Sequence, residues 1–320
     1  LHDALRFSVI SITESENSGG RYFNQRAMRL LFIVNPVSGT GAGKKMPEKI
    51  RKMPEYEGID YDIRFTEYAG HARILVKEAL AEGKYTHIVA VGGDGTVNEV
   101  GTSLVGTSVA FGVVSLGSGN GFARHLGYSV RMKKALRQLL SGAYAQIDLL
   151  EINGTYSLNV SGVGYDAEVA HEFNRFRIRG MISYIFAGLK LWFSYSPQTY
   201  RISYGGTTRE EKCFILSLAN TSQFGNNAFI APHASLRDGL MDVCMLRRPN
   251  LFKVVYFLFC FLNGKIDKLT YYKDIQCREI TIEGPINHVH IDGDAAVMTS
   301  PLHARVLPGA LKVVVPKFAK

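Results

Sequence analysis

Three glycine-rich turns carry the residues best suited to chemistry in this chain, and each follows a short apolar run. The turns are residues 35–39 (NPVSG), 92–96 (GGDGT) and 117–121 (GSGNG). Glycines let the backbone approach phosphate oxygens closely, and N–H groups at the start of a helix favour an anion. A single turn of this kind is usually structural. Three turns after strands of one parallel sheet would meet at its carboxyl edge, so together they predict a phosphate site.

Asp94 lies between two glycines in the second turn. A carboxylate beside a phosphate would repel it unless a cation lay between them, so Asp94 points to Mg²⁺. The alternative is that Asp94 caps the helix expected over residues 97–104. The spacing of the residues does not choose between these two interpretations.

The elements that must position these turns alternate between strand and helix in the first half of the chain. Continuous apolar runs predict strands buried on both faces, the alternation in residues 61–65 predicts a further strand, and apolar residues at helical spacing predict helices between them. The expected strands are residues 30–34, 61–65, 87–91 and 110–114, and the expected helices lie near residues 46–53, 72–80 and 97–104. This order predicts an α/β domain over residues 28–143, with a parallel sheet and helices on both faces.

The second half, residues 144–320, shows alternation with a period of two between turn signals, which is typical of antiparallel strands. Asn153-Gly154, between two alternating segments, is a strong hairpin signal. Further strand-like runs lie at residues 200–204, 213–218, 280–282, 289–291, 304–306 and 311–315. We expect a β-sandwich domain interrupted by one aromatic-rich helix near residues 181–195, with the last residues returning to the first domain.

The composition is that of a globular protein long enough for two domains, with 320 residues of which 46% are hydrophobic and 20% charged. The net charge of +9 suits anionic partners such as nucleotides, acidic lipid headgroups or nucleic acid, without choosing among them. The four cysteines have no spacing typical of a zinc site or a disulfide framework. We therefore expect a reducing, cytoplasmic environment.

Membrane contact is expected at the bilayer surface and not through a spanning helix. The most apolar run, residues 251–262, has twelve residues, whereas a spanning helix needs ~20. Residues 1–27 lack the layout of a signal peptide, and we interpret them as an extension outside the fold. The segments 181–195 and 251–262 are rich in aromatic residues and flanked by Lys and Arg, which suits a membrane interface. The alternative is that both helices simply pack on the sandwich.

The order of several short motifs resembles the diacylglycerol kinase catalytic-domain family, which includes bacterial lipid kinases, sphingosine kinases and ceramide kinases. Residues 91–98 (VGGDGTVN) look like the family signature, although GGDGT also occurs in NAD kinases and phosphofructokinases. The ordered set is far more specific, and it extends from Met28 to about Pro316. The other motifs are NPxSG at 35–39, Thr66 before GHA at 70–72, GSGN at 117–120, GYDA at 164–167, DGL at 238–240 and DGD at 292–294.

The resemblance implies an ATP site between the α/β domain and the β-sandwich domain. It implies that the nucleotide is held by Asn35, Pro36, Val37, Ser38, Gly39, Thr66, Gly92, Gly93, Asp94, Gly95, Thr96, Val97, Asn98, Ser118 and Asn120. Asp238, with the main-chain carbonyls of Ser235 and Leu240, would match the structural Mg²⁺ site of the bacterial members. Asp166 would lie near the lipid headgroup.

The sequence departs from the family at two places. The catalytic base is usually the Glu of an Asp-Gly-Glu motif, and the matching residue here is Asp294. A carboxylate suits this role because the substrate hydroxyl must lose a proton as it attacks phosphorus, although Asp is one methylene shorter. A turn over residues 291–294 without catalysis is the alternative. Many bacterial members have Asp where this chain has Gly121, so the identity of the lipid stays open.

We therefore expect an ATP- and Mg²⁺-dependent lipid kinase that transfers the γ-phosphate to a hydroxyl of a diacylglycerol, a sphingosine-like lipid or a related lipid, with Asp294 and Asp94 as catalytic residues. Its expected partners are the nucleotide and the lipid, reached by peripheral membrane contact from the cytoplasm. Nucleic acid is not expected, and a homodimer stays open. The alternatives are a catalytically silent nucleotide- or lipid-binding protein and an NAD kinase-like enzyme, which the motifs at 164–167 and 292–294 disfavour.

Overall fold

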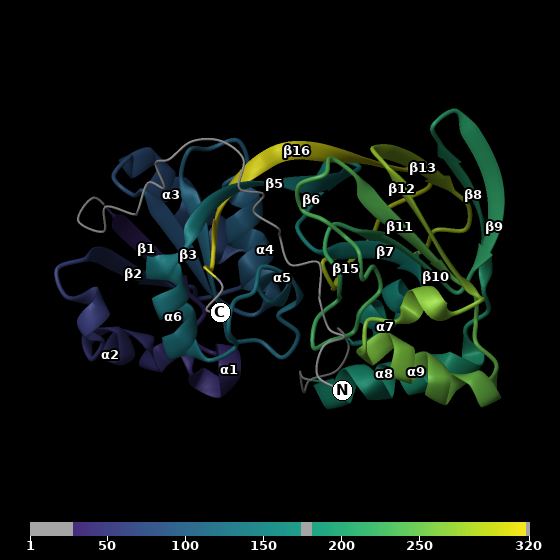
Figure 1. The fold of residues 1–320 in the computed structure, drawn as a ribbon, viewed down its shortest axis with the longest axis horizontal. Helices are drawn as coiled ribbons and strands as arrows, with labels where there is room; N and C mark the ends of the chain where they lie inside the picture. The colour runs from purple at the N-terminus through teal and green to yellow at the C-terminus, as the bar shows by residue number, and fades with distance from the viewer. Residues whose placement is uncertain (1–27, 174–180, 318–320) are drawn as a thin grey trace. The chain divides into compact units, whose positions relative to one another are not determined.

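The computed structural model describes residues 28–173 and 181–317, and the chain divides into two compact units (Figure 1). Unit 1 contains the described residues up to Ile147 and those from Gly309 onward, and unit 2 runs from Asp148 to Pro308. The division falls inside strand β5 (Ala143–Ile152), a few residues beyond the expected boundary at residue 144. The extension expected over residues 1–27 lies outside the described residues.

Unit 1 is built on a parallel sheet. Strand β1 (Arg29–Val34) pairs with β2 (Asp60–Phe65) on one side and with β3 (His87–Gly92) on the other, and β3 pairs with β4 (Ala110–Ser115). Strands β3 and β4 are buried throughout, as their continuous apolar runs predict, whereas the edge strand β2 is partly exposed. The end of strand β16 (Leu302–Val315) lies parallel to β4, with Val313 opposite Phe111.

Helices cover both faces of this sheet. They are α1 (Ser38–Gly41), α2 (Met46–Arg51), α3 (His71–Glu82), α4 (Asp94–Ser103), α5 (Gly121–His125) and α6 (Met132–Ser141), with 3-10 turns η2 (Gly43–Lys45) and η3 (Pro54–Tyr56). A Cβ on Gly112 would lie 2.5 Å from Leu139 of α6, and a Cβ on Gly92 would lie 2.5 Å from Thr96 of α4. Gly92 of β3 lies opposite Ser115 of β4, which is an odd number of residues from Gly112 on the same strand. Because successive positions of a strand face opposite sides of the sheet, Gly92 and Gly112 face opposite sides of it.

Unit 2 is built from two antiparallel sheets. The first has the order β12-β11-β10-β7-β14-β15. Its strands are β7 (Val160–Gly164), β10 (Ile215–Ala219), β11 (Met241–Leu246), β12 (Tyr272–Cys277), β14 (Val289–Ile291) and β15 (Asp294–Ala296). The second sheet contains β6 (Thr155–Ser157), β8 (Gln198–Tyr204), β9 (Thr207–Cys213) and β13 (Glu279–Glu283), together with parts of β5 and β16. The predicted hairpin at Asn153-Gly154 joins β5 to β6.

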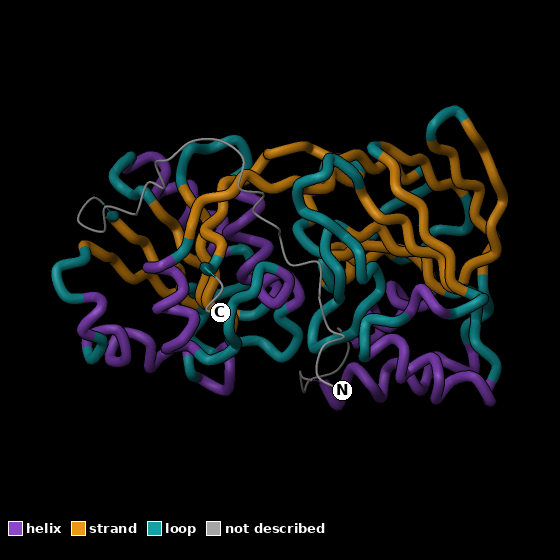
Figure 2. Tube along the Cα trace, in the orientation of Figure 1, coloured by secondary structure: helices purple, strands orange, loops and turns teal. Residues whose placement is uncertain are grey.

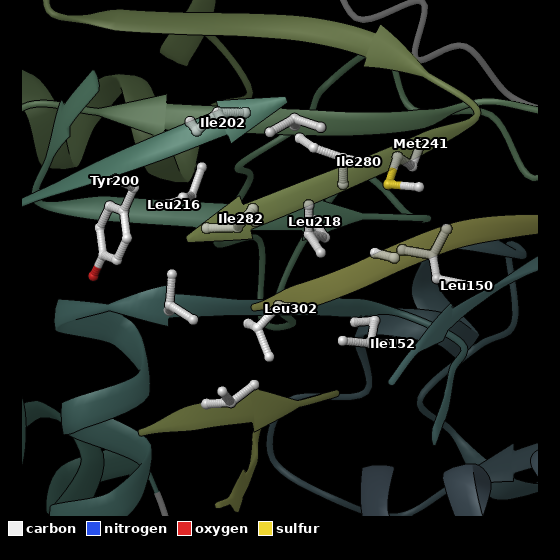
Figure 3. Packing of buried hydrophobic residues seen from close by; sticks show 14 of the residues in the cluster. Leu150, Ile152, Tyr200, Ile202, Leu216, Leu218, Met241, Ile280, Ile282 and Leu302 are labelled. Atoms are coloured by element: carbon white, nitrogen blue, oxygen red, sulfur yellow. The ribbon is translucent and has the colours of Figure 1, made fainter. Parts of the chain in front are cut away.

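The inner faces of the two sheets share one apolar core (Figure 3). Ile202 and Ile280 of the second sheet pack in the same cluster as Leu216 and Met241 of the first, and all four side chains are buried. Residues alternate between this core and the outside along each strand, because successive side chains of a strand point to opposite faces. The packing makes unit 2 a β-sandwich, as its period-two alternation predicts.

The helices of unit 2 gather on one side of its strands (Figure 2). They are α7 (Tyr165–Phe173), α8 (Met181–Ser194) and α9 (Val254–Leu262), with 3-10 turns η4 (Leu251–Lys253) and η5 (Ile266–Lys268). Ile215 and Cys244, which point away from the sandwich core, form a second cluster with Phe257 and Cys260 of α9, and Trp192 of α8 packs against it. This cluster anchors α8 and α9 on the outer face of the first sheet.

Two strand predictions differ from the structure. Residues 304–306 and 311–315 belong to one strand, β16, which continues through the exposed residues Pro308 and Gly309, where Gly309 has a φ of 58°. The run 213–218 is divided at Phe214, whose N–H donates to Leu246 O at 2.7 Å. There the chain leaves β9 of one sheet and enters β10 of the other, so an apolar run that looks continuous serves two sheets.

Candidate functional site

The first predicted turn leaves the end of β1 and folds around the Asn35 side chain. Asn35 Oδ1 accepts a hydrogen bond from the Val37 N–H at 3.1 Å, and Asn35 Nδ2 donates to Thr96 Oγ1 at 3.5 Å. The backbone of Gly39 has a φ of 60°, which glycine adopts without strain. The other predicted residues of this turn, Pro36 and Ser38, are partly exposed. Asn35 therefore connects the first turn to the second.

The second turn joins β3 to α4, and Asp94 is the first residue of that helix. Gly93 holds the N-cap position, so Asp94 is not the helix cap that one interpretation of the sequence proposes. Its carboxylate bonds to the third turn instead, where Oδ2 accepts from the Asn120 N–H at 2.9 Å and Oδ1 from the Gly121 N–H at 3.0 Å. Asp94 thus joins the second and third turns. Neither interpretation of the sequence included this contact.

The third turn packs directly on the second. A Cβ on Gly117 would lie 2.8 Å from Gly93 Cα, so only glycine allows this close approach. Asn120 has a φ of 58°, and its Nδ2 donates to Gly117 O at 2.7 Å. Its Oδ1 is buried and has no hydrogen-bond partner in the part of the chain that the structure describes, which leaves an acceptor for a ligand. Ser118 is exposed in the same turn.

The predicted nucleotide residues therefore gather at the carboxyl ends of the parallel strands of unit 1. Thr66 follows β2, is buried, and donates its N–H to Val34 O at 2.9 Å at the end of β1. The Leu116 N–H donates to Gly92 O at 2.7 Å, which holds the starts of the second and third turns together. The remaining predicted residues continue into the first turns of α4 and are Gly95, Thr96, Val97 and Asn98.

Helices α3 and α4 are joined by two residues that the sequence did not single out. The Glu99 carboxylate accepts hydrogen bonds from the N–H groups of Gly70 and Ala72 at 2.8 and 3.2 Å, so it neutralises the start of α3. The Arg73 guanidinium donates to Asn98 Oδ1 at 3.1 Å. Glu99 directly follows the predicted motif at residues 91–98. This position was the one sign in the sequence that Glu99 belongs to the site.

In unit 2, the motif at residues 292–294 forms a tight turn fixed by a buried carboxylate. Asp292 and Gly293 have φ values of 53° and 91° and connect β14 to β15, as in a type I′ hairpin. The Asp292 carboxylate accepts from Ser157 Oγ at 2.6 Å and from the N–H groups of Leu158 and Asn159, each at 2.8 Å. These three donors stabilise its charge inside the protein.

Asp166, predicted to lie near the headgroup, is buried at the start of α7 with 5% of its surface exposed. Its Oδ2 lies 3.0 Å from Ser217 Oγ and 3.0 Å from His290 Nε2. His290 in turn accepts a hydrogen bond from the Gly293 N–H at 3.3 Å. The structure thereby links Asp166 to the turn that precedes Asp294, the predicted base, which is exposed at the start of β15.

The residues predicted to bind the structural metal, Ser235, Asp238 and Leu240, lie in the loop between β10 and β11. Asp148, which the sequence analysis did not single out, accepts from the Gly239 N–H at 2.8 Å. Partial burial, together with the nearby Asp148 charge, raises the pKa of Asp238 above its ordinary value. Among the described residues no group of three or more His, Cys, Asp or Glu side chains is arranged to hold a metal, so a cation in this loop would depend on main-chain oxygens.

Comparison with known proteins agrees with both units. Residues 29–152 match the diacylglycerol kinase catalytic domain, and residues 159–315 match the YegS C-terminal NAD kinase beta sandwich-like domain. The chain is 30% identical over 242 residues to a diacylglycerol kinase of Bacillus subtilis, covering 74% of this chain and 80% of that one. It is 28% identical over 312 residues to a diacylglycerol kinase of Mycobacterium tuberculosis, covering 94% and 99% of the two chains.

The fold is also found in solved structures. A crystal structure of a candidate diacylglycerol kinase from Bacillus anthracis superposes with a TM-score of 0.73 at 22% identity, covering 95% of this chain and 98% of that one. The chain therefore belongs to the diacylglycerol kinase family of lipid kinases. Within residues 28–173 and 181–317, no helix is long and apolar enough to cross a membrane.

Proposed function

We propose that this protein transfers the γ-phosphate of ATP to a hydroxyl of a diacylglycerol, a sphingosine-like lipid or a related lipid, with Mg²⁺ as cofactor. The observation that carries the proposal is the joining of three glycine turns in unit 1. Asp94 bonds the second turn to the third, and Asn35 bonds the first to Thr96 of the second. Glycine backbones and a helix start at the carboxyl edge of a parallel sheet favour a bound phosphate chain.

The metal has two candidate places among the described residues. One is the Asp94 carboxylate, which bonds to the N–H groups of Asn120 and Gly121 between the second and third turns and is the hard oxygen ligand that a cation beside the phosphates prefers. The loop of Ser235, Asp238 and Leu240 offers only hard oxygen donors, and the like charges of Asp148 and Asp238 favour a cation there. Mg²⁺, when bound, would neutralise charge on the transferring phosphate.

Asp294 is the proposed base for the acceptor hydroxyl. Asp294 is an exposed residue at the start of β15, directly after a hairpin loop that the bonds from the Leu158 and Asn159 N–H groups to Asp292 hold in place. An ionised carboxylate at this position would accept the proton of the lipid hydroxyl as the oxygen attacks phosphorus. Its short side chain makes the exact position of the turn important for the reaction.

We propose that the lipid is reached by peripheral contact with a membrane from the cytoplasm, through α8, η4 and α9. Phe193, Phe252 and Val255 are 72%, 97% and 77% exposed, although they are large apolar residues. Lys253 caps the start of α9 and Lys265 lies between α9 and η5, and this combination suits an anionic bilayer surface. The other exposed large apolar residues of this surface are Phe186, Leu189, Tyr256, Leu258, Phe259 and Leu262.

Transfer of labelled phosphate from ATP tests the proposal, with diacylglycerol, monoacylglycerol, sphingosine and NAD as acceptors. We expect phosphorylation of at least one lipid and its loss on addition of a chelator. The variants Asp94→Asn and Asp294→Asn should each reduce kcat by about 100-fold or more, the range typical of lost acid–base or positioning groups. Full lipid phosphorylation in both variants would refute the mechanism. Binding of ATP without transfer would favour a silent binding protein, and transfer to NAD alone an NAD kinase-like enzyme.

A further inference from the structure

His290 is a buried histidine whose two ring nitrogens are both bonded within unit 2. It lies on β14 with 1% of its surface exposed, two residues before Asp292. Nδ1 lies 3.3 Å from the Gly293 N–H, and Nε2 lies 3.0 Å from Asp166 Oδ2. The residues expected to bind the nucleotide, the metal and the acceptor do not include His290.

These contacts determine the tautomer of the imidazole. The backbone N–H of Gly293 can only donate, so Nδ1 must present its lone pair. The proton of the neutral ring therefore lies on Nε2 and is donated to the Asp166 carboxylate, as in other sites where a carboxylate orients an imidazole. Asp166 also accepts from Ser217 Oγ at 3.0 Å. Asp166 and Ser217 thus hold the ring in a single orientation.

The turn before Asp294 is consequently fixed from two sides. The Asp292 carboxylate holds it against Leu158 and Asn159, and His290 holds the Gly293 N–H from the other side. Without His290, the Gly293 N–H would lose the bond that restrains the peptide leading into Asp294 from this side, although Asp292 and the β14–β15 pairing would still hold the turn. A short Asp base is more sensitive to this direction than a longer Glu, because its side chain has one fewer bond with which to adjust.

We propose that His290, oriented by Asp166 and Ser217, is a positioning residue for Asp294, and that Asp166 acts on the reaction through His290. This inference rests on the proposed function of Asp294 as base. It gives Asp166 a role different from that of a charged ligand for the headgroup, because its buried carboxylate already serves Ser217 and His290.

Two substitutions at His290 separate the two bonds. In His290→Asn the amide oxygen lies near the position of Nδ1 and can still accept from Gly293. In His290→Gln the amide nitrogen reaches the position of Nε2 and can still donate to Asp166, but the bond to Gly293 is lost. We expect His290→Gln to lower kcat by about 10- to 100-fold with KM for lipid and ATP changed less than about threefold. His290→Asn should retain clearly more of kcat.

A double substitution distinguishes positioning from a general loss of stability. If His290 acts only through Asp294, His290→Gln should have no further effect on kcat in an Asp294→Asn background, whereas a merely structural defect would add to it. Asp166→Asn should lower kcat with little change in KM for the lipid. A rise in KM for the lipid at unchanged kcat would overturn the proposal in favour of a direct headgroup contact.

Hydrogen exchange tests the positioning bond independently of activity. The Gly293 amide should exchange faster in His290→Gln than in the wild type, and His290→Asn should keep most of its protection. Equal exchange in all three proteins would refute the role of His290. A wild-type protein that phosphorylates no lipid would instead count against the proposed function, and the exchange result would still decide whether His290 holds the turn.

Discussion

At the scale of single residues, the two glycines that face each other between the second and third turns have different steric requirements. A Cβ on Gly117 would lie 2.8 Å from Gly93 Cα and 3.0 Å from Asn120 Oδ1, whereas a Cβ on Gly93 would lie 3.6 Å from Gly117 Cα. A methyl group at Gly117 would force the backbone of the second and third turns apart. We therefore expect Gly117→Ala to lower the free energy of unfolding by about 1–3 kcal/mol, measured by chemical denaturation.

Gly93→Ala is the matched control for this prediction. Gly93 has a φ of −86°, which any residue adopts, and its new Cβ would make only ordinary contact. We expect its free energy of unfolding to change by less than about 1 kcal/mol. Equal losses in the two variants would show that the turns are not packed as closely as the structure has them.

At the scale of elements, the exposed apolar side chains of η4 and α9 give a prediction for membrane binding. Phe252 and Phe259 are 97% and 52% exposed, and the Lys265 ammonium lies 5.6 Å from the Phe259 ring centre. We expect the double variant Phe252→Ser/Phe259→Ser to bind anionic phosphatidylglycerol vesicles at least about tenfold more weakly in a sedimentation assay, because each aromatic ring contributes apolar area.

Ile74→Ser, on α3 of unit 1, is the control for vesicle binding. Ile74 is 45% exposed, so the substitution removes exposed apolar surface from an element outside the proposed membrane contact. It should bind vesicles as the wild type does, and all proteins should bind neutral phosphatidylcholine vesicles more weakly. If the double variant and Ile74→Ser bind alike, the surface of α9 is not the membrane contact.

At the scale of the whole molecule, acid should weaken the fold through His87 of unit 1. The imidazole is buried between Thr86 Oγ1 at 2.7 Å and the Tyr144 hydroxyl at 2.8 Å. Burial, with a smaller effect of the Lys312 charge, lowers the pKa of His87 to about 4. The unfolded chain binds a proton near pH 6.5 and the folded chain does not. Stability is therefore lost as the pH falls from about 6.5 towards 4, by up to about 3 kcal/mol.

His87→Gln tests this linkage, because glutamine does not titrate and its amide can still bond to Tyr144. The free energies of unfolding of the two proteins should be compared at pH 7 and at pH 4.5. We expect the wild type to lose more stability than the variant over this interval. Parallel losses would mean that other groups account for the acid sensitivity of unit 1.

The sequence was sufficient for most elements and for the positions of the three glycine turns. Apolar runs bounded by glycine identify buried parallel strands, as in β3 and β4, and period-two alternation with Asn153-Gly154 identifies the sandwich and its hairpin. It did not reveal strands β11 and β12. Nor did it show that the chain changes sheets at Phe214, because the hydrophobicity of a run does not record which sheet it joins.

The sequence by itself determined the family, the α/β and β-sandwich classes of the two units, and the carboxylates available for chemistry. It determined these because local spacing decides whether a segment forms a strand, a helix or a turn, and because the motifs keep their order along the chain. Only the tertiary structure decided what each carboxylate contacts. Asp94 meets Asn120, Asp292 meets Leu158, and Asp166 meets His290 across long stretches of sequence. Such contacts depend on how sheets bring distant segments together, which local spacing does not record.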